Sequence, residues 1–76
     1  MERAEFYQMV EEITGADSGS INDDTVLKGL EGWDSLAIVQ FVATVDERLG
    51  VIIPVKQITT CITMSDLAKI FSDKVH

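Results

Sequence analysis

The sequence predicts a small all-α protein. Three stretches of the 76-residue chain place apolar side chains at helical spacing, with residues typical of helix starts or ends beside them. The one short β-like run, Val51-Ile52-Ile53-Pro54, has no second stretch with which it could pair. Hydrophobic residues make up 46% of the chain, which is enough to fold without disulfides. A single α-helical domain over residues 1–76 is therefore expected.

The first predicted helix covers residues 2–14. Its apolar residues recur at helical spacing and form one stripe: Phe6, Met9, Val10 and Ile13. The glutamates lie away from this stripe, so the opposite face is expected to be in water. Gly15 follows directly and is typical of a helix C-terminus.

Residues 15–34 show no sustained periodicity and are rich in turn-forming residues. Four apolar residues can hold this segment on the core: Ile21, Val26, Leu27 and Leu30. We therefore expect an ordered crossover rather than a flexible linker. A calcium loop starting at Asp17 is not expected, because Asn22 stands where an EF-hand needs glycine and Lys28 where it needs glutamate.

The second predicted helix runs from Ser35 to Leu49 and is closed by Gly50. One sector of it is expected to face the core, with Phe41 beside it: Ile38, Val42, Val45 and Leu49. A second apolar strip lies away from that sector, bordered by Gln40 and Glu47: Leu36, Val39 and Ala43. Two interpretations of this strip remain open, a docking surface or a helix buried on all sides.

The remainder is expected to be helical after an extended connector at Val51–Pro54. Val55 to Thr60 is expected to form one short helical turn. Thr63 and Asp66 resemble a capping box that opens a last helix to about Lys74. The apolar residues expected to face the core from this helix are Leu67, Ile70 and Phe71.

Composition limits the classes of partner. The formal net charge is −7, from thirteen carboxylates against six Lys and Arg, which argues against nucleic acid or an anionic membrane and favours a basic protein surface. No stretch approaches the roughly 20 apolar residues of a membrane span, and the N-terminus is not a signal peptide, so a cytoplasmic monomer is expected. The one cysteine, Cys61, is expected to be a buried structural thiol.

The chain offers no constellation for catalysis or metal binding. Ser35 lacks the G-x-S-x-G context of a nucleophilic serine, and the one histidine, His76, is the last residue. No cluster of residues has the spacing of metal ligands. We therefore expect no enzymatic activity and no bound metal.

The Asp34-Ser35 turn is the most informative local feature. Asp34 is a good N-cap, and Ser35 then occupies the first helical position, near the positive end of the helix dipole. Such a position suits an attached phosphate. An Asp-Ser pair before an apolar run is equally an ordinary helix start, so local chemistry leaves a modification site and a simple cap both open.

The full chain resembles the acyl carrier protein family. The resemblance rests on Gly32-Trp33-Asp34-Ser35-Leu36 with Val39, on Asp46-Glu47-Arg48-Leu49-Gly50-Val51 with Ile53-Pro54, and on Thr63-Met64-Ser65-Asp66-Leu67. It implies a four-helix bundle with three longer helices, a short third helix and a long ordered loop between helices one and two.

The same resemblance implies the function of the turn. In this family a phosphopantetheinyl transferase, using Mg²⁺, moves 4′-phosphopantetheine from coenzyme A to the serine that Ser35 matches, and the terminal thiol then holds acyl groups as thioesters. Asp34 would pair with a basic residue of the transferase. The partner-binding residues would lie along helix two: Leu36, Val39, Gln40, Ala43 and Glu47. The residues that would line an acyl pocket, or else form plain core, are Phe41, Val45, Ile53, Ile58 and Ile62.

Departures from the family pattern bear on the pathway. Carriers of bacterial fatty acid biosynthesis usually have acids where this chain has Ala37 and Gln40, and they tend to be acidic at Val55-Lys56-Gln57. We therefore expect a freestanding acyl carrier protein of a specialised lipid, polyketide or related pathway, serving acyl- or aminoacyl-activating and acyl-transferring enzymes. The alternatives are an aminoacyl or peptidyl carrier of non-ribosomal peptide type and a helical interaction module that carries nothing.

Overall fold

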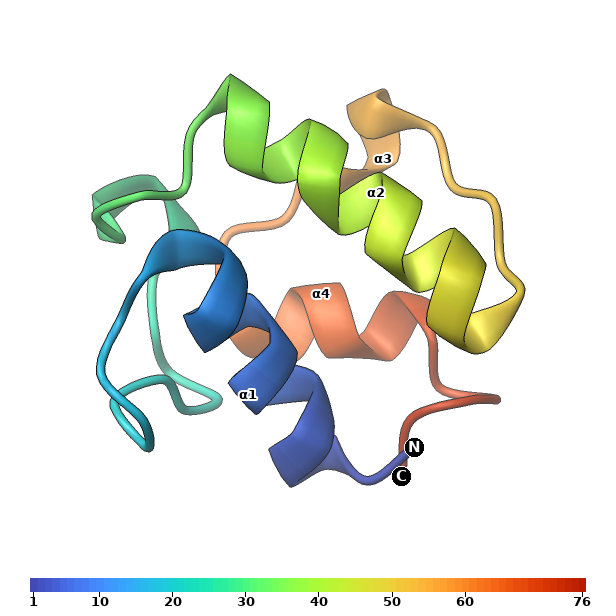
Figure 1. The fold of residues 1–76 in the computed structure, drawn as a ribbon, viewed down its shortest axis with the longest axis horizontal. Helices are drawn as coiled ribbons and strands as arrows, with labels where there is room; N and C mark the ends of the chain where they lie inside the picture. The colour runs from blue at the N-terminus through green and yellow to red at the C-terminus, as the bar shows by residue number, and fades with distance from the viewer.

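The computed structural model describes all 76 residues and contains four α-helices and one 3₁₀ turn. The elements are α1 (Arg3–Thr14), η1 (Leu27–Gly29), α2 (Ser35–Leu49), α3 (Val55–Thr59) and α4 (Met64–Ile70). α1 packs against α2 and α4, and α2 also contacts α3. In Figure 1, α2 lies along one side and the two chain ends meet on the opposite side. The predicted all-α class, with a short third helix, is confirmed, and no helix is both long enough and apolar enough to cross a membrane.

Three phenylalanine rings from different parts of the chain meet in the centre of the core. Phe6 of α1 lies 5.9 Å from Phe41 of α2 and 5.7 Å from Phe71, between ring centroids, and Phe41 lies 6.1 Å from Phe71. All three side chains are at most 2% exposed. Aromatic pairs at such distances add to the burial of their large apolar surfaces, so this cluster joins α1, α2 and the end of α4.

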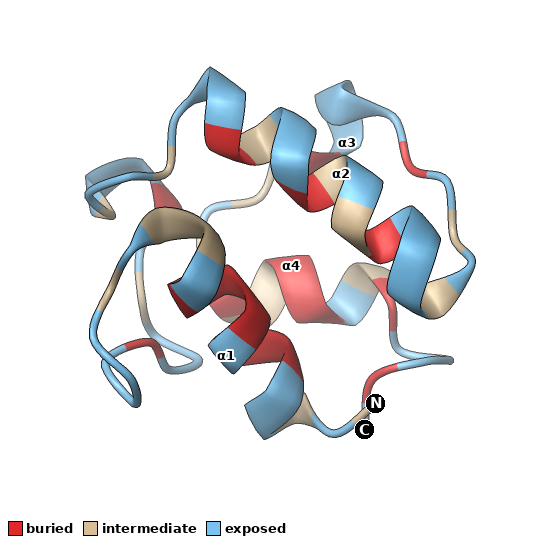
Figure 2. Cartoon of the chain, in the orientation of Figure 1, coloured by how far each residue is buried: buried red, intermediate tan, exposed pale blue.

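The buried face of α2 is centred differently from the prediction. Ala37, Phe41 and Val45 are buried, whereas Ile38, Val42 and Leu49 lie at the edges of the face and are only partly buried. The reason is that Phe41 joins the aromatic cluster, which also turns its i−4 and i+4 neighbours inward. The second apolar strip is exposed along its length, so the interpretation of a helix buried on all sides is wrong (Figure 2).

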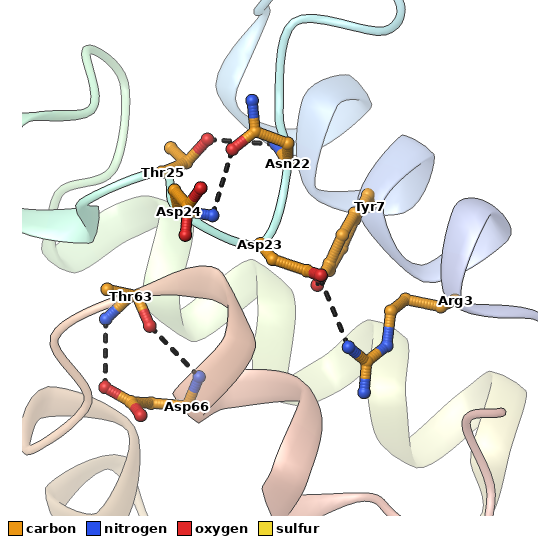
Figure 3. A network of polar contacts seen from close by, with 8 residues as sticks. All are labelled: Arg3, Tyr7, Asn22, Asp23, Asp24, Thr25, Thr63 and Asp66. Carbon is orange, nitrogen blue, oxygen red and sulfur yellow. Dashed lines mark hydrogen bonds and ion pairs between the residues drawn. The ribbon is translucent and has the colours of Figure 1, made fainter.

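Residues 15–34 form an ordered crossover, as predicted, and polar contacts to α1 hold it in addition to apolar ones. The residue Glu11 is only 5% exposed, and its carboxylate accepts the Ile21 N–H at 3.0 Å. The helical pattern had predicted that Glu11 would lie on the solvent-exposed face of α1. The Tyr7 hydroxyl donates to the Asp23 carboxylate, which also lies 3.3 Å from Arg3 Nη1 (Figure 3). These contacts fasten the crossover to α1.

The second half of the crossover is paired with the start of α4. The Met64 N–H donates to the Thr25 carbonyl at 2.9 Å, and the Leu27 N–H donates to the Ile62 carbonyl at the same distance. Val26, predicted to pin the segment through its side chain, is 49% exposed and contributes a backbone bridge to Thr63 instead. The fold therefore places the loop before α2 beside the segment that follows α3.

α4 begins at the predicted capping box. Thr63 Oγ1 accepts the Asp66 N–H at 3.2 Å and the Asp66 carboxylate accepts the Thr63 N–H at 3.1 Å (Figure 3). The backbone N–H groups of Thr63 and Ile62, which both donate to the Asp66 carboxylate, hold the pKa of Asp66 below its usual value. The helix ends at Ile70, not near Lys74, because Phe71 leaves the helical backbone and residues 71–74 continue as turns.

Candidate functional site at the start of α2

A short turn delivers the chain to the start of α2. The Trp33 N–H donates to the Leu30 carbonyl at 3.1 Å, and Gly32 between them has φ +87°. A positive φ at the third residue of a β-turn is the signature of type II, which favours glycine there. Trp33 is partly buried and meets Phe41 edge to face, with centroids 5.6 Å apart. The residues immediately before Asp34 are therefore fixed to the core.

The first turn of α2 leaves one hydroxyl free. Asp34 is the N-cap and accepts the Ala37 N–H at 2.9 Å, as predicted. Ser35 is the first residue of the 15-residue helix and is exposed, and no hydrogen bond involves its hydroxyl. The first turn itself holds no acidic residue, and the one carboxylate beside Ser35, that of the N-cap Asp34, accepts the Ala37 N–H at the positive end of the dipole. A phosphate carried by Ser35 would fit this position.

Ser35 has no histidine beside it. The one histidine, His76, is the last residue, and its backbone N–H donates to the Met1 carbonyl at 3.0 Å. The two chain ends lie on the side of the molecule away from the start of α2 (Figure 1). The serine hydroxyl is thus exposed, with no imidazole beside it.

The face of α2 next to Ser35 carries apolar side chains that are exposed to solvent. Leu36 and Val39 are 76% and 60% exposed, and the other residues predicted for partner binding, Gln40, Ala43 and Glu47, are exposed as well. The acids of α2 are confined to Asp46 and Glu47, near its C-terminal end. The surface beside the serine is therefore uncharged over the first turns of the helix.

A cavity of about 400 Å³ lies between α2, α3 and the crossover, and its wall includes Trp33, two residues before Ser35. It is lined mainly by apolar side chains, which are Val26, Leu27, Trp33, Ile38, Ile58, Cys61 and Ile62, together with Lys28, Thr59 and Thr60. Of the predicted pocket residues, Ile58 and Ile62 line it, while Phe41, Val45 and Ile53 are buried in the core. The cavity reaches the surface, since Ile62 is 66% exposed.

Most of the lining was not found from the sequence. The crossover residues Val26 to Lys28 reach the cavity only because the chain pairs at Leu27 and Ile62, which are far apart in sequence. The one local signal was Trp33, a large apolar side chain placed two residues before the serine. A bulky residue there would have pointed to an apolar surface beside the hydroxyl.

Cys61 is not the buried thiol that the sequence suggested. It is partly exposed and forms part of the cavity wall. Burial, and to a lesser degree the charge of Asp66, raises the pKa of its thiol. The side chain therefore stays a neutral thiol at physiological pH, beside the same cavity as Trp33.

The family comparison covers this whole arrangement. The model of the family described as "Phosphopantetheine attachment site" matches residues 4–71, from α1 to the end of α4 and including the Asp34-Ser35 turn. No curated protein and no solved structure matches the chain. No group of three or more His, Cys, Asp or Glu side chains is placed to hold a metal ion.

Proposed function

Because the chain belongs to the phosphopantetheine attachment site family, whose model covers residues 4–71, we propose that Ser35 is the residue that bears the arm. Members of this family carry a covalently attached 4′-phosphopantetheine, whose thiol holds cargo as a thioester. Domains of this kind generally carry substrates for other enzymes rather than catalyse reactions. The observation that carries the proposal is the exposed, unbonded Ser35 hydroxyl at the first position of α2.

The other helix-start serine is a poorer acceptor. Ser65 lies in the first turn of α4, but it is partly buried, whereas Ser35 is exposed. α4 has only seven residues, against fifteen in α2. Ser35 is the better acceptor because it is exposed and begins the longer helix.

Each part of the turn has a role in the proposed transfer. The Ser35 oxygen forms the new bond to phosphorus as the pyrophosphate bond of coenzyme A breaks. Adenosine 3′,5′-bisphosphate leaves, and the serine proton passes to a base of the transferase. Asp34 keeps the helix start closed by accepting the Ala37 N–H. The first-turn N–H groups then face the new phosphodiester, which the helix dipole stabilises.

The proposed attachment is tested by intact mass. The chain is incubated with coenzyme A, Mg²⁺ and a broad-specificity phosphopantetheinyl transferase, alongside its Ser35→Ala and Ser65→Ala variants. We expect the wild type and Ser65→Ala to gain one phosphopantetheine and Ser35→Ala to gain none. No gain in the wild type, or a gain that survives in Ser35→Ala, would contradict the proposal.

For the cargo we propose an acyl group rather than an aminoacyl group. The wall of the cavity that includes Trp33 and Ile38 is mostly apolar, and each methylene removed from water contributes about 0.8 kcal/mol. Lys28 is the one charged residue of the wall, and it would repel the ammonium group of an aminoacyl thioester. The uncharged first turns of α2 further support acyl-handling partners outside routine fatty acid biosynthesis, in a specialised lipid, polyketide or related pathway.

The cargo proposal has two built-in reporters, because Trp33 and Cys61 are the only tryptophan and cysteine and both line the cavity. The transferase is used to load Ser35 from an octanoyl and from a β-alanyl coenzyme A thioester. We expect the octanoyl form to slow the reaction of Cys61 with a thiol reagent and to shift Trp33 emission, and the β-alanyl form to change neither. Protection by the β-alanyl form alone would favour an aminoacyl or peptidyl carrier.

A further inference from the structure

Gly32 lies closer to the end of α1 than any side chain would allow. A Cβ added at Gly32 would lie 2.3 Å from the Thr14 carbonyl oxygen and 3.1 Å from both the carbonyl carbon and the Cα of Thr14. All three atoms are backbone, so no rotamer change could relieve the overlap. The turn before Ser35 therefore rests directly on the last residue of α1.

The other glycines with positive φ do not share this contact. Gly15, Gly19 and Gly50 have φ of +78°, +81° and +68°, but a Cβ at any of them would meet nothing within 4 Å. Backbone conformation alone favours glycine at those positions. At Gly32 a close backbone approach excludes a side chain as well.

The contact is transmitted to the serine over a short distance along the chain. Gly32 closes the turn whose next residue, Trp33, is bonded to the Leu30 carbonyl and meets Phe41 edge to face. Phe41 in turn contacts Phe6 of α1. The turn is thus held to α1 directly at Thr14 and indirectly through the aromatic cluster, and only Asp34 separates Trp33 from Ser35.

We propose that Gly32 is a positioning residue, which rests on the Thr14 carbonyl and so holds the Ser35 hydroxyl where the transferase can reach it. This inference rests on attachment at Ser35. A side chain at position 32 would lift the turn from α1 and displace Trp33 and Ser35. Leu36 and Val39 would still lie on a formed helix, so the docking surface would remain.

The test compares Gly32→Ala with Gly19→Ala, which places alanine at nearly the same φ in open space. A misplacement of about 1 Å can cost on the order of 100-fold in rate, so we expect kcat for transfer to Gly32→Ala to fall by about that factor with KM unchanged. Trp33 emission should shift to the red while the helical circular dichroism is kept. Gly19→Ala should match the wild type in each measurement.

A second pair of variants covers the case in which Gly32→Ala does not fold. Thr14→Gly removes the Thr14 Oγ1 contacts to Val10 O at 2.9 Å and to the Ala16 N–H at 3.4 Å, which loosens the end of α1 without adding an atom at Gly32. Glu12→Gly places the same helix-weakening residue on an exposed position and is the control. We expect Thr14→Gly to lower kcat and shift Trp33 emission more than Glu12→Gly does.

The outcomes separate this inference from the proposed function. If Gly32→Ala folds and matches Gly19→Ala in kcat and in Trp33 emission, the positioning role is wrong. If Gly32→Ala does not fold, equality of Thr14→Gly and Glu12→Gly overturns it. A wild type that takes up no arm contradicts attachment at Ser35 and with it the role in transfer. The fluorescence emission of Trp33 in the unmodified variants then still tests whether Gly32 holds the turn before Ser35 against the end of α1.

Discussion

The two sides of the molecule use their polar side chains differently. On the side of α1, the crossover and α4, some side-chain hydrogen bonds join separate elements, as between Tyr7 and Asp23 or between Glu11 and Ile21. On the side of α2 and α3, they stay within one helical turn: Thr44 donates to the Gln40 carbonyl, and Thr60 to that of Gln57. The first side is tied together by its polar groups, and the second is not.

Exposed apolar residues follow the same division. Five of the six large hydrophobic residues with high exposure lie on α2, on α3 or in the segments beside α3: Leu36, Val39, Ile52, Val55 and Ile62. The cavity opens on this side as well. Apolar patches left in water commonly mark binding surfaces. The α1 side therefore serves as a scaffold, while the α2–α3 side keeps the groups that a partner or cargo can cover.

The largest expected difference between the two sides is in stability. Phe6 on α1 is fully buried and contacts both other phenylalanines of the cluster, so Phe6→Ala should lower the free energy of unfolding by about 3–5 kcal/mol. Leu36→Ala on α2 removes a side chain that is 76% exposed and should change the free energy of unfolding by less than about 0.5 kcal/mol. Urea unfolding measures both. Similar losses would show that α2 belongs to the scaffold along its whole surface.

The next difference is in recognition. Val39→Glu introduces a charge at the centre of the exposed strip, and burying that charge at an interface is unfavourable. We expect KM of the transferase for this variant to rise about tenfold, which corresponds to about 1.4 kcal/mol of docking energy. Gln8→Glu adds the same charge on an exposed position of α1 and is the control.

Steady-state kinetics and circular dichroism together decide the outcome for Val39. Equal KM values for Val39→Glu and Gln8→Glu would remove the strip from the proposed recognition surface. Loss of helical signal in Val39→Glu would mean that the side chain supports the fold, in conflict with its 60% exposure.

The parts of the fold that depend on local chemistry were predictable. The start of α2 at Ser35 and its end before Gly50 follow from a cap and a helix stop that lie within a few residues of the helix. The capping box at Thr63 was visible for the same reason. Four residues in sequence contain the whole interaction, so no knowledge of the tertiary structure is needed.

The parts that depend on contacts between distant segments were not predictable. Glu11 appeared to be a surface acid until the crossover brought the Ile21 N–H to it. Periodicity gave the apolar residues of α2, but the aromatic cluster decided that Phe41 would be at the centre of the buried face. Gly32 could be recognised as a turn residue, yet its contact with Thr14 exists only in the folded chain.

The smallest expected difference concerns pH and tests the polar ties of the scaffold. Burial, reinforced by the hydrogen bond to Asp23, raises the pKa of Tyr7 from 10.0 to about 12, and the bond from Tyr7 lowers that of Asp23. Since the unfolded chain releases the tyrosine proton first, stability from this pair should fall as pH rises from 10.0 to about 12. In acid, the stability that ionised Asp23 contributes should be lost as pH falls below 3.8, because the Asp23 carboxylate is protonated first in the unfolded chain.

Tyr7 is the only tyrosine, so its ionisation can be followed directly by absorbance while unfolding free energies are measured across the same pH range. The difference in stability between the wild type and Tyr7→Phe should be greatest between the two pH limits and shrink beyond each of them. No matching change is expected on the other side of the molecule, where Thr60→Val removes a hydroxyl bonded only to the Gln57 carbonyl of its own turn. A titration of Tyr7 near 10.0 would show that its burial and its tie to Asp23 are not maintained in solution. The crossover would then be held to α1 by the Glu11–Ile21 bond and the apolar core.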